Sequence, residues 1–377
     1  MLIVEMTETL PSERSPKRSD YYDNSVLAGR LRILLAEVLL PALIVLVISN
    51  FIFRTPWLLD RMDRYRPGRR GLSTTTHVER QMLHIEAEAR LNRRKAKAVF
   101  IGTSSVVNGI DVESIEAVWR KTDFNFKPVN YGLTGLMAYE LPFLKDQLIT
   151  SEVEVIIFLY NTFCFSDVIH PQAASIRFDV YESIRNPVWS KAKPQHFFKG
   201  FWGDMFFVIR YRGVVKELLY RLVKGRLVEL PHGYDFNPGQ PRRGKRPRRV
   251  ERPARGHWLR QAYVTSDTDH DTISYRGFRR FLDLAKSAGI KVVIAAMPVP
   301  DFARSNRYRI GVNHDRIDSR VEEIARAYGA PFISRSRIRA IEKEDSLFWD
   351  RIHLHDTGRT LYSVWLAETL PTLIRSN

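Results

Sequence analysis

Short apolar runs alternate with amphipathic segments from residue 97 to the end of the chain. The runs have the length and the Val, Ile and Phe content of β-strands. They are Lys97–Gly102, Lys127–Tyr131, Val153–Tyr160, Lys291–Ala296 and Pro331–Ser334. Helical spacing of apolar positions predicts helices at Asp111–Lys121, Ala138–Thr150, Ile273–Ala288, Asp315–Tyr328 and Leu361–Leu373. This alternation predicts an α/β domain around a parallel sheet covered on both faces, with its site outside the carboxyl ends of the strands.

A longer apolar run, Ile33–Phe53, precedes this pattern and carries one charge, Glu37. As a helix it would reach about 30 Å, the thickness of a bilayer core, and Pro41 is tolerable in such a helix. A buried core helix is the alternative, but no polar face interrupts Val38–Ile48. A cleaved signal peptide fits less well, because the run starts late and no small-residue cleavage site follows it. The sequence therefore predicts a single-pass membrane anchor.

Basic residues on the two sides of the run do not determine its orientation. The N-terminal flank holds Arg14, Lys17, Arg18, Arg30 and Arg32, and the C-terminal flank holds Arg54, Arg61, Arg64, Arg66, Arg69 and Arg70. These numbers are too similar for the positive-inside rule to decide. The predicted organisation is a polar tail at 1–29, an anchor at 30–54, a helical stalk at 55–95 and the α/β domain at 96–377.

The chain of 377 residues has a net charge of +17, which favours anionic partners such as lipid headgroups or acidic polysaccharide. Most of the excess positive charge comes from arginines scattered along the chain. Such scattered arginines are also common in proteins where they form no binding site. An insertion at about 170–270 separates the third and fourth strands. Its part Phe206–Leu227 is either a basic amphipathic helix on a membrane surface or a helix packed on the domain. Its part Pro238–Arg255 is a basic loop, either solvated or binding anionic lipid or acidic polysaccharide. We consider nucleic acid an improbable partner, because interleaved aromatic residues and a recognised module are missing.

Two short motifs carry candidate chemistry. Ser104 follows Gly102 at the end of the first strand, where a turn into a helix would expose its hydroxyl. Asp350 precedes His353 by three residues, a spacing that lets the carboxylate hold the imidazole Nδ1–H while Nε2 faces a serine. Taken singly, these motifs also occur as helix caps, phosphate-binding turns or solvated loops.

Taken together and in order, the motifs resemble the SGNH (GDSL-like) hydrolases. That family has G-x-S after the first strand, a glycine after the second, an asparagine after the third, and D-x-x-H before the last helix. Here FIGTSS supplies Ser104, VNYGLTG supplies Gly135, FLYN supplies Asn161, and WDRIH supplies Asp350 and His353. The resemblance implies a Ser104 nucleophile, a His353 base oriented by Asp350, and an oxyanion hole of the Ser104 N–H, the Gly135 N–H and the Asn161 amide.

The resemblance covers about 97–165 and 270–373 and departs from the family pattern in places. Thr103 replaces the usual Asp of G-D-S, Leu159 replaces a glycine, and Thr162 rather than Asp follows the asparagine. Ser105 rivals Ser104, and Gly132 rivals Gly135. These looser blocks resemble the anchored bacterial branch, which includes cell-envelope polysaccharide O-acetyltransferases.

The resemblance implies a flavodoxin-like three-layer sandwich behind one transmembrane helix, held at the cytoplasmic membrane with its main domain in the periplasm. The expected activity is that of a serine esterase or O-acyltransferase, acting on acetyl or similar groups of an envelope glycan. An inactive scaffold of an envelope polysaccharide complex is the alternative. The sequence shows no metal-ligand spacing, phosphate loop or dinucleotide fingerprint, so we expect no cofactor. With Cys164 as its single cysteine, the chain cannot form an intramolecular disulfide.

Overall fold

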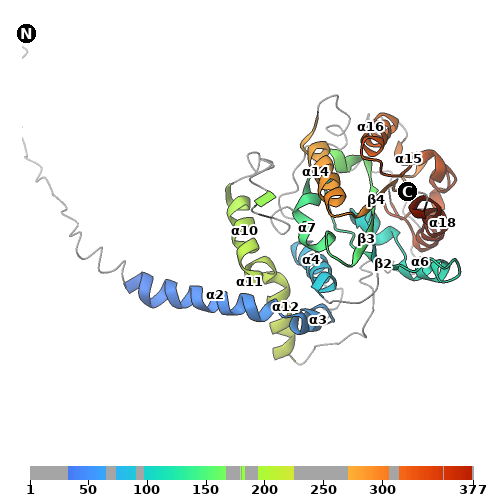
Figure 1. The fold of residues 1–377 in the computed structure, drawn as a ribbon. Helices are drawn as coiled ribbons and strands as arrows, with labels where there is room; N and C mark the ends of the chain where they lie inside the picture. Colours follow the sequence, from blue (N-terminus) through green and yellow to red (C-terminus); the bar gives the residue numbers. More distant parts are fainter. Residues whose placement is uncertain are drawn as a thin grey trace, which may run out of the picture. The chain divides into compact units, whose positions relative to one another are not determined.

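Five parallel strands in the order β2-β1-β3-β4-β5 form the central sheet of this mixed α/β protein (Figure 1). The strands are β1 (Lys97–Gly102), β2 (Lys127–Asn130), β3 (Val153–Tyr160), β4 (Lys291–Ala296) and β5 (Phe332–Ile333). The structure is a computed structural model that describes residues 33–64, 74–90, 97–166, 179, 181–182, 194–224, 271–304, 314–350 and 352–375. The polar tail and the basic run Pro238–Arg255 lie outside the described residues. The predicted parallel sheet is confirmed.

The burial of the neighbouring strands β1 and β3 accounts for the continuous apolar runs in these two segments of the sequence. Every residue of β1 is buried, and so is every residue of β3 except Glu154. Their register pairs Phe100 with Ile157 and Gly102 with Leu159, so the two strands end side by side. A strand buried on both faces has no polar side, which is the pattern that parallel sheets produce.

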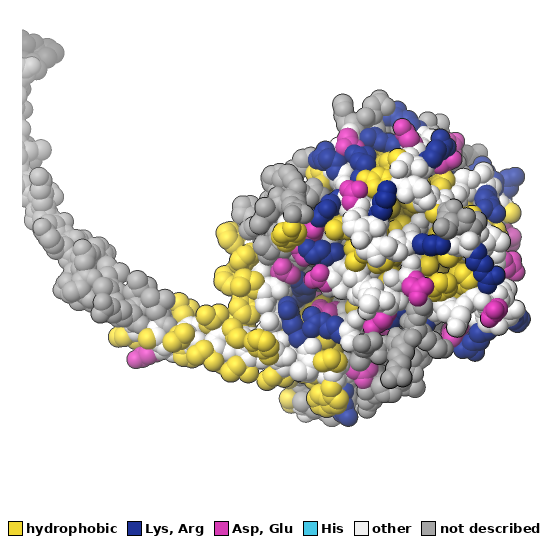
Figure 2. Space-filling view, viewed as in Figure 1, with side chains coloured by type: hydrophobic (Ala, Val, Ile, Leu, Met, Phe, Trp, Pro, Cys, Tyr) yellow, Lys and Arg dark blue, Asp and Glu magenta, His cyan; other side chains and the backbone are white. Residues whose placement is uncertain are grey.

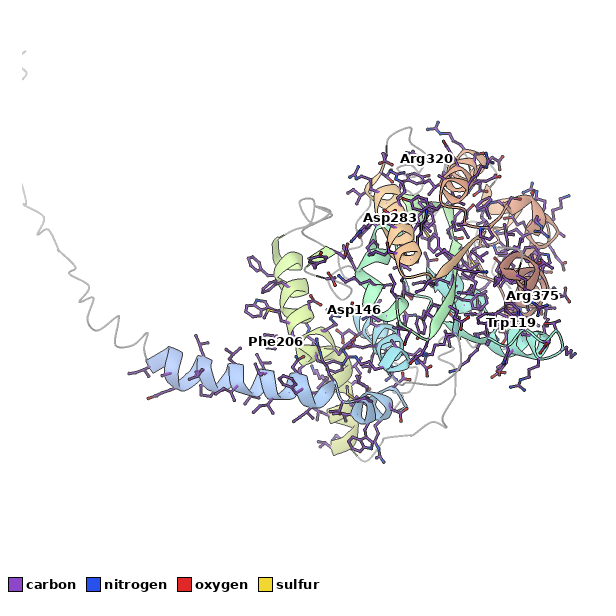
Figure 3. The ribbon with its side chains drawn as sticks, viewed as in Figure 1. Trp119, Asp146, Phe206, Asp283, Arg320 and Arg375 are labelled. Atoms are coloured by element: carbon purple, nitrogen blue, oxygen red, sulfur yellow. The ribbon has the colours of Figure 1, made fainter. Side chains whose placement is uncertain are left out.

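The helices that connect or follow these strands, apart from those of the insertion, are α5 (Ser104–Gly109), α6 (Val112–Trp119), α7 (Lys145–Leu148), α14 (Ile273–Ser287), α15 (Asp301–Arg304), α16 (His314–Ala327), α17 (Arg339–Glu342) and α18 (Asp356–Arg375). Figure 1 shows α7 and α14 on one side of the strands and α6 and α18 on the other. The Trp119 indole, labelled in Figure 3, donates to the Ala367 carbonyl at 3.0 Å and so fixes α6 against α18.

Two helices differ from the sequence prediction. The segment expected as a helix at Ala138–Thr150 is a 3₁₀-helix, η2 (Ala138–Leu144), followed by the short α7. Pro142 lies inside it and has no N–H to donate, which disfavours a continuous α-helix. The last helix starts at Asp356 rather than Leu361, because its first turn, Asp-Thr-Gly-Arg, has no apolar periodicity in the sequence.

Short 3₁₀-helices make up several of the remaining connections. They are η3 (Thr162–Phe165), η6 (Arg335–Ile338) and η7 (Asp345–Leu347). The first follows the carboxyl end of β3, and the other two lie between β5 and the final helix.

The segment expected as a stalk contains α3 (Pro56–Arg64) and α4 (Thr74–Arg90). α4 is buried along most of its length, including Met82 and Leu83. Its polar side chains are paired: Glu79 accepts from the Val214 N–H at 3.0 Å, and Gln81 accepts from the Thr134 N–H at 2.9 Å. α4 therefore packs as a core helix of the unit Ser49–Asn377.

The insertion between β3 and β4 contains α10 (Pro194–Met205), α11 (Phe207–Arg210) and α12 (Arg212–Val223). Buried Tyr211 connects this group to α4 through a hydrogen bond from its hydroxyl to Glu86 at 2.5 Å. Val214 and Val215 on α12 are also buried. One face of α12 is thus packed on the domain.

The N-terminal apolar run consists of a π-helical segment, η1 (Leu34–Leu39), and α2 (Leu40–Phe53). Pro41 offers no N–H to the Glu37 carbonyl, so a regular α-helical bond is impossible at that point. The stretch Ala36–Phe53 is long and apolar enough to cross a membrane, and none of it is buried.

A buried ion network holds the carboxyl edge of β4. Arg335 is 4% exposed and donates to Asp318 at 2.8 Å, to Glu342 at 2.9 Å and to the Met297 carbonyl at 3.0 Å. The Tyr160 hydroxyl donates to Asp318 at 2.8 Å. Burial and the neighbouring Asp318 raise the pKa of Tyr160 well above its ordinary value. Removing the cation would take from buried Asp318 the guanidinium that it pairs with and would leave Glu342 the longer contact to Arg339 at 3.4 Å.

We expect Arg335→Met to lower the free energy of unfolding by about 3–5 kcal/mol, because breaking a buried ion pair leaves unpaired buried charge. Arg326→Met is the control, since Arg326 is 77% exposed and pairs only within its own helix; its loss should stay below about 1 kcal/mol. Urea unfolding of the detergent-solubilised full chain measures both. Equal losses in the two variants would contradict the importance of the network.

Candidate active site

Ser104 is the first residue of α5, directly beyond the carboxyl end of β1. Thr103 caps this helix, accepting a hydrogen bond from the Ser105 N–H. The turn requires glycine at 102, because a Cβ there would lie 2.2 Å from the Leu159 carbonyl oxygen of β3. Close approach of β1 and β3 therefore sets where the Ser104 hydroxyl emerges.

The structure brings Ser104, His353 and Asp350 together in a hydrogen-bonded chain. His353 Nε2 lies 2.9 Å from Ser104 Oγ, and His353 Nδ1 lies 2.8 Å from Asp350 Oδ2. The first contact joins residues 249 positions apart. The His353 side chain is 22% exposed and that of Asp350 is 35% exposed, so these hydrogen-bonded side chains lie at the surface and are accessible to solvent.

Local backbone bonds position the imidazole. Phe348 and Leu354 form an antiparallel bridge, and the Trp349 N–H donates to the His353 carbonyl at 2.9 Å. Asp350 Oδ1 accepts from the N–H groups of Ile352 and His353, both at 2.9 Å. One carboxylate oxygen thus organises the turn and leaves the other for the imidazole.

Asp350 is held in its ionised form. Burial alone would raise its pKa, but the hydrogen bond and charge of His353, with the two backbone N–H groups, outweigh burial and lower the pKa. An ionised carboxylate favours the tautomer with a proton on Nδ1, which leaves Nε2 free to accept a proton from serine.

The two backbone N–H groups that the sequence resemblance suggests as oxyanion donors are not occupied by other acceptors among the described residues. In the part of the chain that the structure describes, neither the Ser104 N–H nor the Gly135 N–H makes a hydrogen bond. Gly135 has φ +70°, a conformation that favours glycine. The rival Gly132 N–H is occupied, since it donates to Asn130 Oδ1 at 2.9 Å. The Leu133 N–H donates to the Gly102 carbonyl at 2.8 Å, which keeps this loop beside β1.

Asn161, fully buried at the end of β3, contacts the neighbours of Ser104 and not Ser104 itself. Its Nδ2 donates to Ser105 Oγ at 2.5 Å and to Thr103 Oγ1 at 3.3 Å. Its Oδ1 is buried without a partner. Rotating the amide by half a turn would let both hydroxyls donate to Oδ1 and would free the NH₂ group. The present arrangement shows Asn161 as a neighbour of the site with its donors already used.

The structure also distinguishes the two candidate serines by their burial and their hydrogen bonds. Ser105 is fully buried and bonds Asn161, whereas Ser104 is partly exposed and bonds His353. Only Ser104 therefore has a base within hydrogen-bond reach among the contacts described.

Sequence reasoning missed Asn130, which organises the first two loops. Its Nδ2 donates to the carbonyls of Val106 and Ile110 at 3.1 and 3.3 Å, while its Oδ1 accepts from Gly132. An asparagine as the last residue of a strand was the available signal. Thr162 was noted only as a departure; its hydroxyl lies 2.9 Å from His314 Nδ1.

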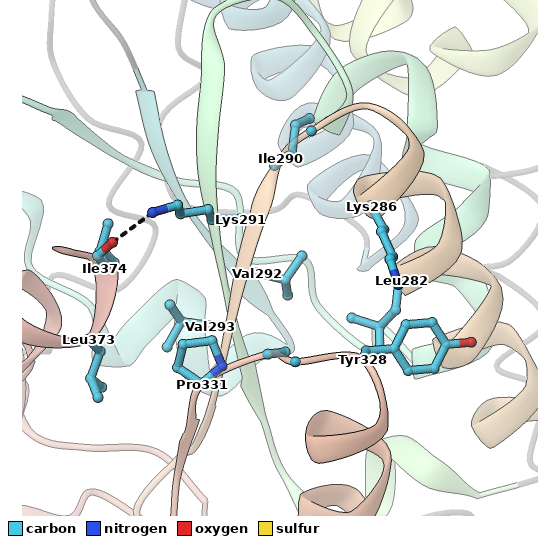
Figure 4. A pocket seen from close by; sticks show the side chains of 13 residues that line it. Leu282, Lys286, Ile290, Lys291, Val292, Val293, Tyr328, Pro331, Leu373 and Ile374 are labelled. Carbon is cyan, nitrogen blue, oxygen red and sulfur yellow. Dashed lines mark hydrogen bonds between the residues drawn. The ribbon is translucent and has the colours of Figure 1, made fainter. Parts of the chain in front are cut away.

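No group of three or more His, Cys, Asp or Glu side chains suited to a metal occurs within the described ranges. A cavity of about 270 Å³ lies at the amino-terminal end of β4, lined by Lys286, Lys291 and Tyr328 among others (Figure 4). Ser104 follows the carboxyl end of β1, so this cavity lies at the opposite edge of the parallel sheet and belongs to no part of the serine site.

Comparison of the sequence with models of known protein families and with curated proteins finds no match. The chemical interpretation of the site therefore depends on its geometry, in which a partly exposed serine hydroxyl, an imidazole and an ionised carboxylate are joined by hydrogen bonds.

The lowered pKa of Asp350 gives the folded state stability that is present above the ordinary Asp pKa and lost as the pH falls through the folded-state pKa. Wild type should therefore exceed Asp350→Asn in free energy of unfolding most clearly above about pH 4, and the difference should shrink toward about pH 3. Urea titrations across this range measure it. A difference that stays constant or grows on acidification would contradict the ionised pair.

Proposed function

We propose that this protein is a membrane-anchored serine esterase or O-acyltransferase of the SGNH kind. The single observation that carries the proposal is the hydrogen-bonded chain from Ser104 through His353 to Asp350 at the carboxyl edge of a parallel sheet. The order of the four sequence blocks supports it. The proposal includes a flavodoxin-like three-layer arrangement of the domain.

The first half-reaction follows from the contacts. As Ser104 Oγ attacks the carbonyl carbon of an ester, its proton passes to His353 Nε2. The negative charge on the carbonyl oxygen would be stabilised by the N–H groups of Ser104 and Gly135. Collapse of the tetrahedral intermediate breaks the bond to the leaving alcohol, which takes the proton from His353 and leaves an acyl group on Ser104.

The second half-reaction uses the same groups in the reverse direction. His353 accepts a proton from water or from a sugar hydroxyl, whose oxygen attacks the acyl carbon and releases Ser104. Water gives an esterase and a sugar hydroxyl gives an O-acyltransferase. We propose a small acyl group such as acetyl and an envelope or secreted polysaccharide as substrate or acceptor.

The proposed location is the cytoplasmic membrane, with Ala36–Phe53 as a single-pass anchor and the α/β domain on the periplasmic side. The length and apolar character of this helix support the anchor. The basic run Pro238–Arg255, which lies outside the described residues, is proposed as a contact for anionic lipid or acidic polysaccharide.

A non-catalytic role is the second candidate, and one observation favours it. Both donors of the Asn161 amide are used by Ser105 and Thr103, so the side chain that should complete the oxyanion hole is not free. In that case the domain would be a scaffold or binding subunit of a polysaccharide assembly complex.

We expect Ser104→Ala to abolish labelling by a fluorophosphonate probe and to lower hydrolysis of p-nitrophenyl acetate by roughly 1000-fold or more, because no nucleophile remains. Ser105→Ala is the matched control and should keep its labelling, since Ser105 has no contact with His353. Activity equal to wild type in Ser104→Ala would remove the nucleophile assignment. A well-folded wild type that does not label would favour the scaffold.

Asn161→Ala tests whether the Asn161 amide is the third donor of the proposed oxyanion hole. If the amide turns to face the oxyanion, kcat should fall by about 100-fold with little change in KM, because the interaction forms only in the transition state. Thermal unfolding provides the second readout. Unchanged kcat with a lowered Tm would show that Asn161 only holds Ser105 and Thr103 in place.

A further inference from the structure

An apolar face of α10 is exposed. Phe198, Trp202 and Met205 lie on one side of this helix at helical spacing and are 59%, 45% and 47% exposed. Figure 2 shows hydrophobic side chains gathered along this helix. Large contiguous apolar patches on protein surfaces mark sites that contact a partner or a membrane.

The opposite side of the same element is packed. Gly200 and Gly203 are buried, and the ring of buried Phe206, which follows the helix (labelled in Figure 3), stacks on Trp202 with centroids 5.9 Å apart. The exposure of α10 is therefore one-sided, as in a helix lying between a protein and an apolar surface.

Contacts made by the end of α2 indicate which apolar surface the exposed face of α10 meets. Within the unit Ser49–Asn377, the last turn of α2 contacts the junction of α10 and α11. The Phe207 N–H donates to Asn50 Oδ1 at 3.0 Å, and the rings of Phe53 and Phe207 stack with centroids 5.7 Å apart. The Arg54 guanidinium donates to the Asp204 carbonyl at 3.2 Å. The end of the apolar run is thus attached to α10, which keeps this helix at the boundary where the chain leaves a membrane.

Nearby residues have the character of a membrane interface. Trp57, on α3 and four residues beyond Phe53, is 65% exposed, and the Arg61 guanidinium lies 5.2 Å from its ring centre. Tryptophan and arginine beside an apolar span are typical of the headgroup region. On α12, apolar and basic side chains are exposed together: Arg212, Lys216, Leu219, Tyr220, Val223 and Lys224. Their positive charge suits anionic headgroups.

We propose that the face of α10 formed by Phe198, Trp202 and Met205 inserts into the headgroup and upper acyl region of the bilayer, beside the anchor. This inference rests on the proposed anchoring by α2 and adds a second attachment point. Two attachments fix the tilt of the α/β domain, whereas a single helix would leave it free to turn. The occupant is the lipid surface rather than a second protein, because the contacts of Asn50, Phe53 and Arg54 hold α10 where the span ends.

The test uses the full chain in vesicles of phosphatidylcholine with a minor share of phosphatidylglycerol. Single variants Phe198→Cys and Met205→Cys are labelled with the environment-sensitive fluorophore NBD. Leu361→Cys is the matched control, since Leu361 is 49% exposed on α18. Native Cys164 does not compete, because it is buried and burial raises its pKa to about 12. Quenching by lipids carrying doxyl groups on their acyl chains is measured, and extraction with alkaline carbonate reports anchoring.

We expect the labels at 198 and 205 to be quenched roughly twofold or more, since interfacial helices bury their apolar face 5–10 Å into the bilayer, and the label at 361 to be unaffected. Anchored protein without this quenching overturns the inference and leaves the anchor standing. Shielding from aqueous iodide without lipid quenching also overturns it, by indicating a protein partner. Carbonate-extractable protein overturns the anchor. If the protein is extracted by carbonate but the label at position 198 is still quenched by lipid, α10 binds lipid without the anchor. If the protein is extracted and the label is not quenched, both the anchor and the insertion of α10 are wrong.

Discussion

The contact between Ser104 and His353 depends on how closely β1 and β3 approach at their carboxyl ends. The Leu159 carbonyl leaves no room for a side chain at position 102, so the chain turns there and presents the next residues at the edge. The same edge receives the loop after β2 through the bond from Leu133 to the Gly102 carbonyl. The large sequence separation between Ser104 and His353 is bridged by α18, which follows His353 and is bound to the segment after Ser104. The Asp111 N–H donates to Ser363 Oγ at 2.8 Å, and the Trp119 indole donates to the Ala367 carbonyl at 3.0 Å. Asp350 and His353 are organised within one turn.

Charged groups have different environments in two regions near the carboxyl ends of the strands. Around Asp350 the groups are partly exposed, so they are accessible from solvent. Around Arg335 they are buried and fully paired, and they hold the Met297 carbonyl and the Val299 N–H of the segment after β4. Buried ion pairs of this kind add little net stability but make one arrangement much better than its alternatives.

The sequence was sufficient for the parts governed by local pattern. Strand limits at β1, β3 and β4 followed from continuous apolar runs, and the hydrogen bonds of His353 to Ser104 and Asp350 were expected from the family resemblance that these motifs carry. Other features depend on tertiary contacts that a pattern does not encode. α4 lies in the segment that was expected to be a helical stalk; its buried position depends on partners such as Val214 and Thr134 that lie far along the chain. The occupied amide of Asn161 likewise depends on the hydroxyls of Ser105 and Thr103, which lie 56 and 58 positions earlier in the sequence.

α4 also links the insertion to the candidate site. Through Glu79 and Glu86 it holds Val214 and Tyr211, next to the helices that we place at the membrane. Through Gln81 it holds the Thr134 N–H, one residue before the available donor Gly135. A glycine with positive φ has little intrinsic preference for one conformation, so its donor direction is set by such neighbouring bonds. The position of the Gly135 N–H, which we propose as an oxyanion donor, therefore depends on the same buried helix that holds the insertion through Val214 and Tyr211.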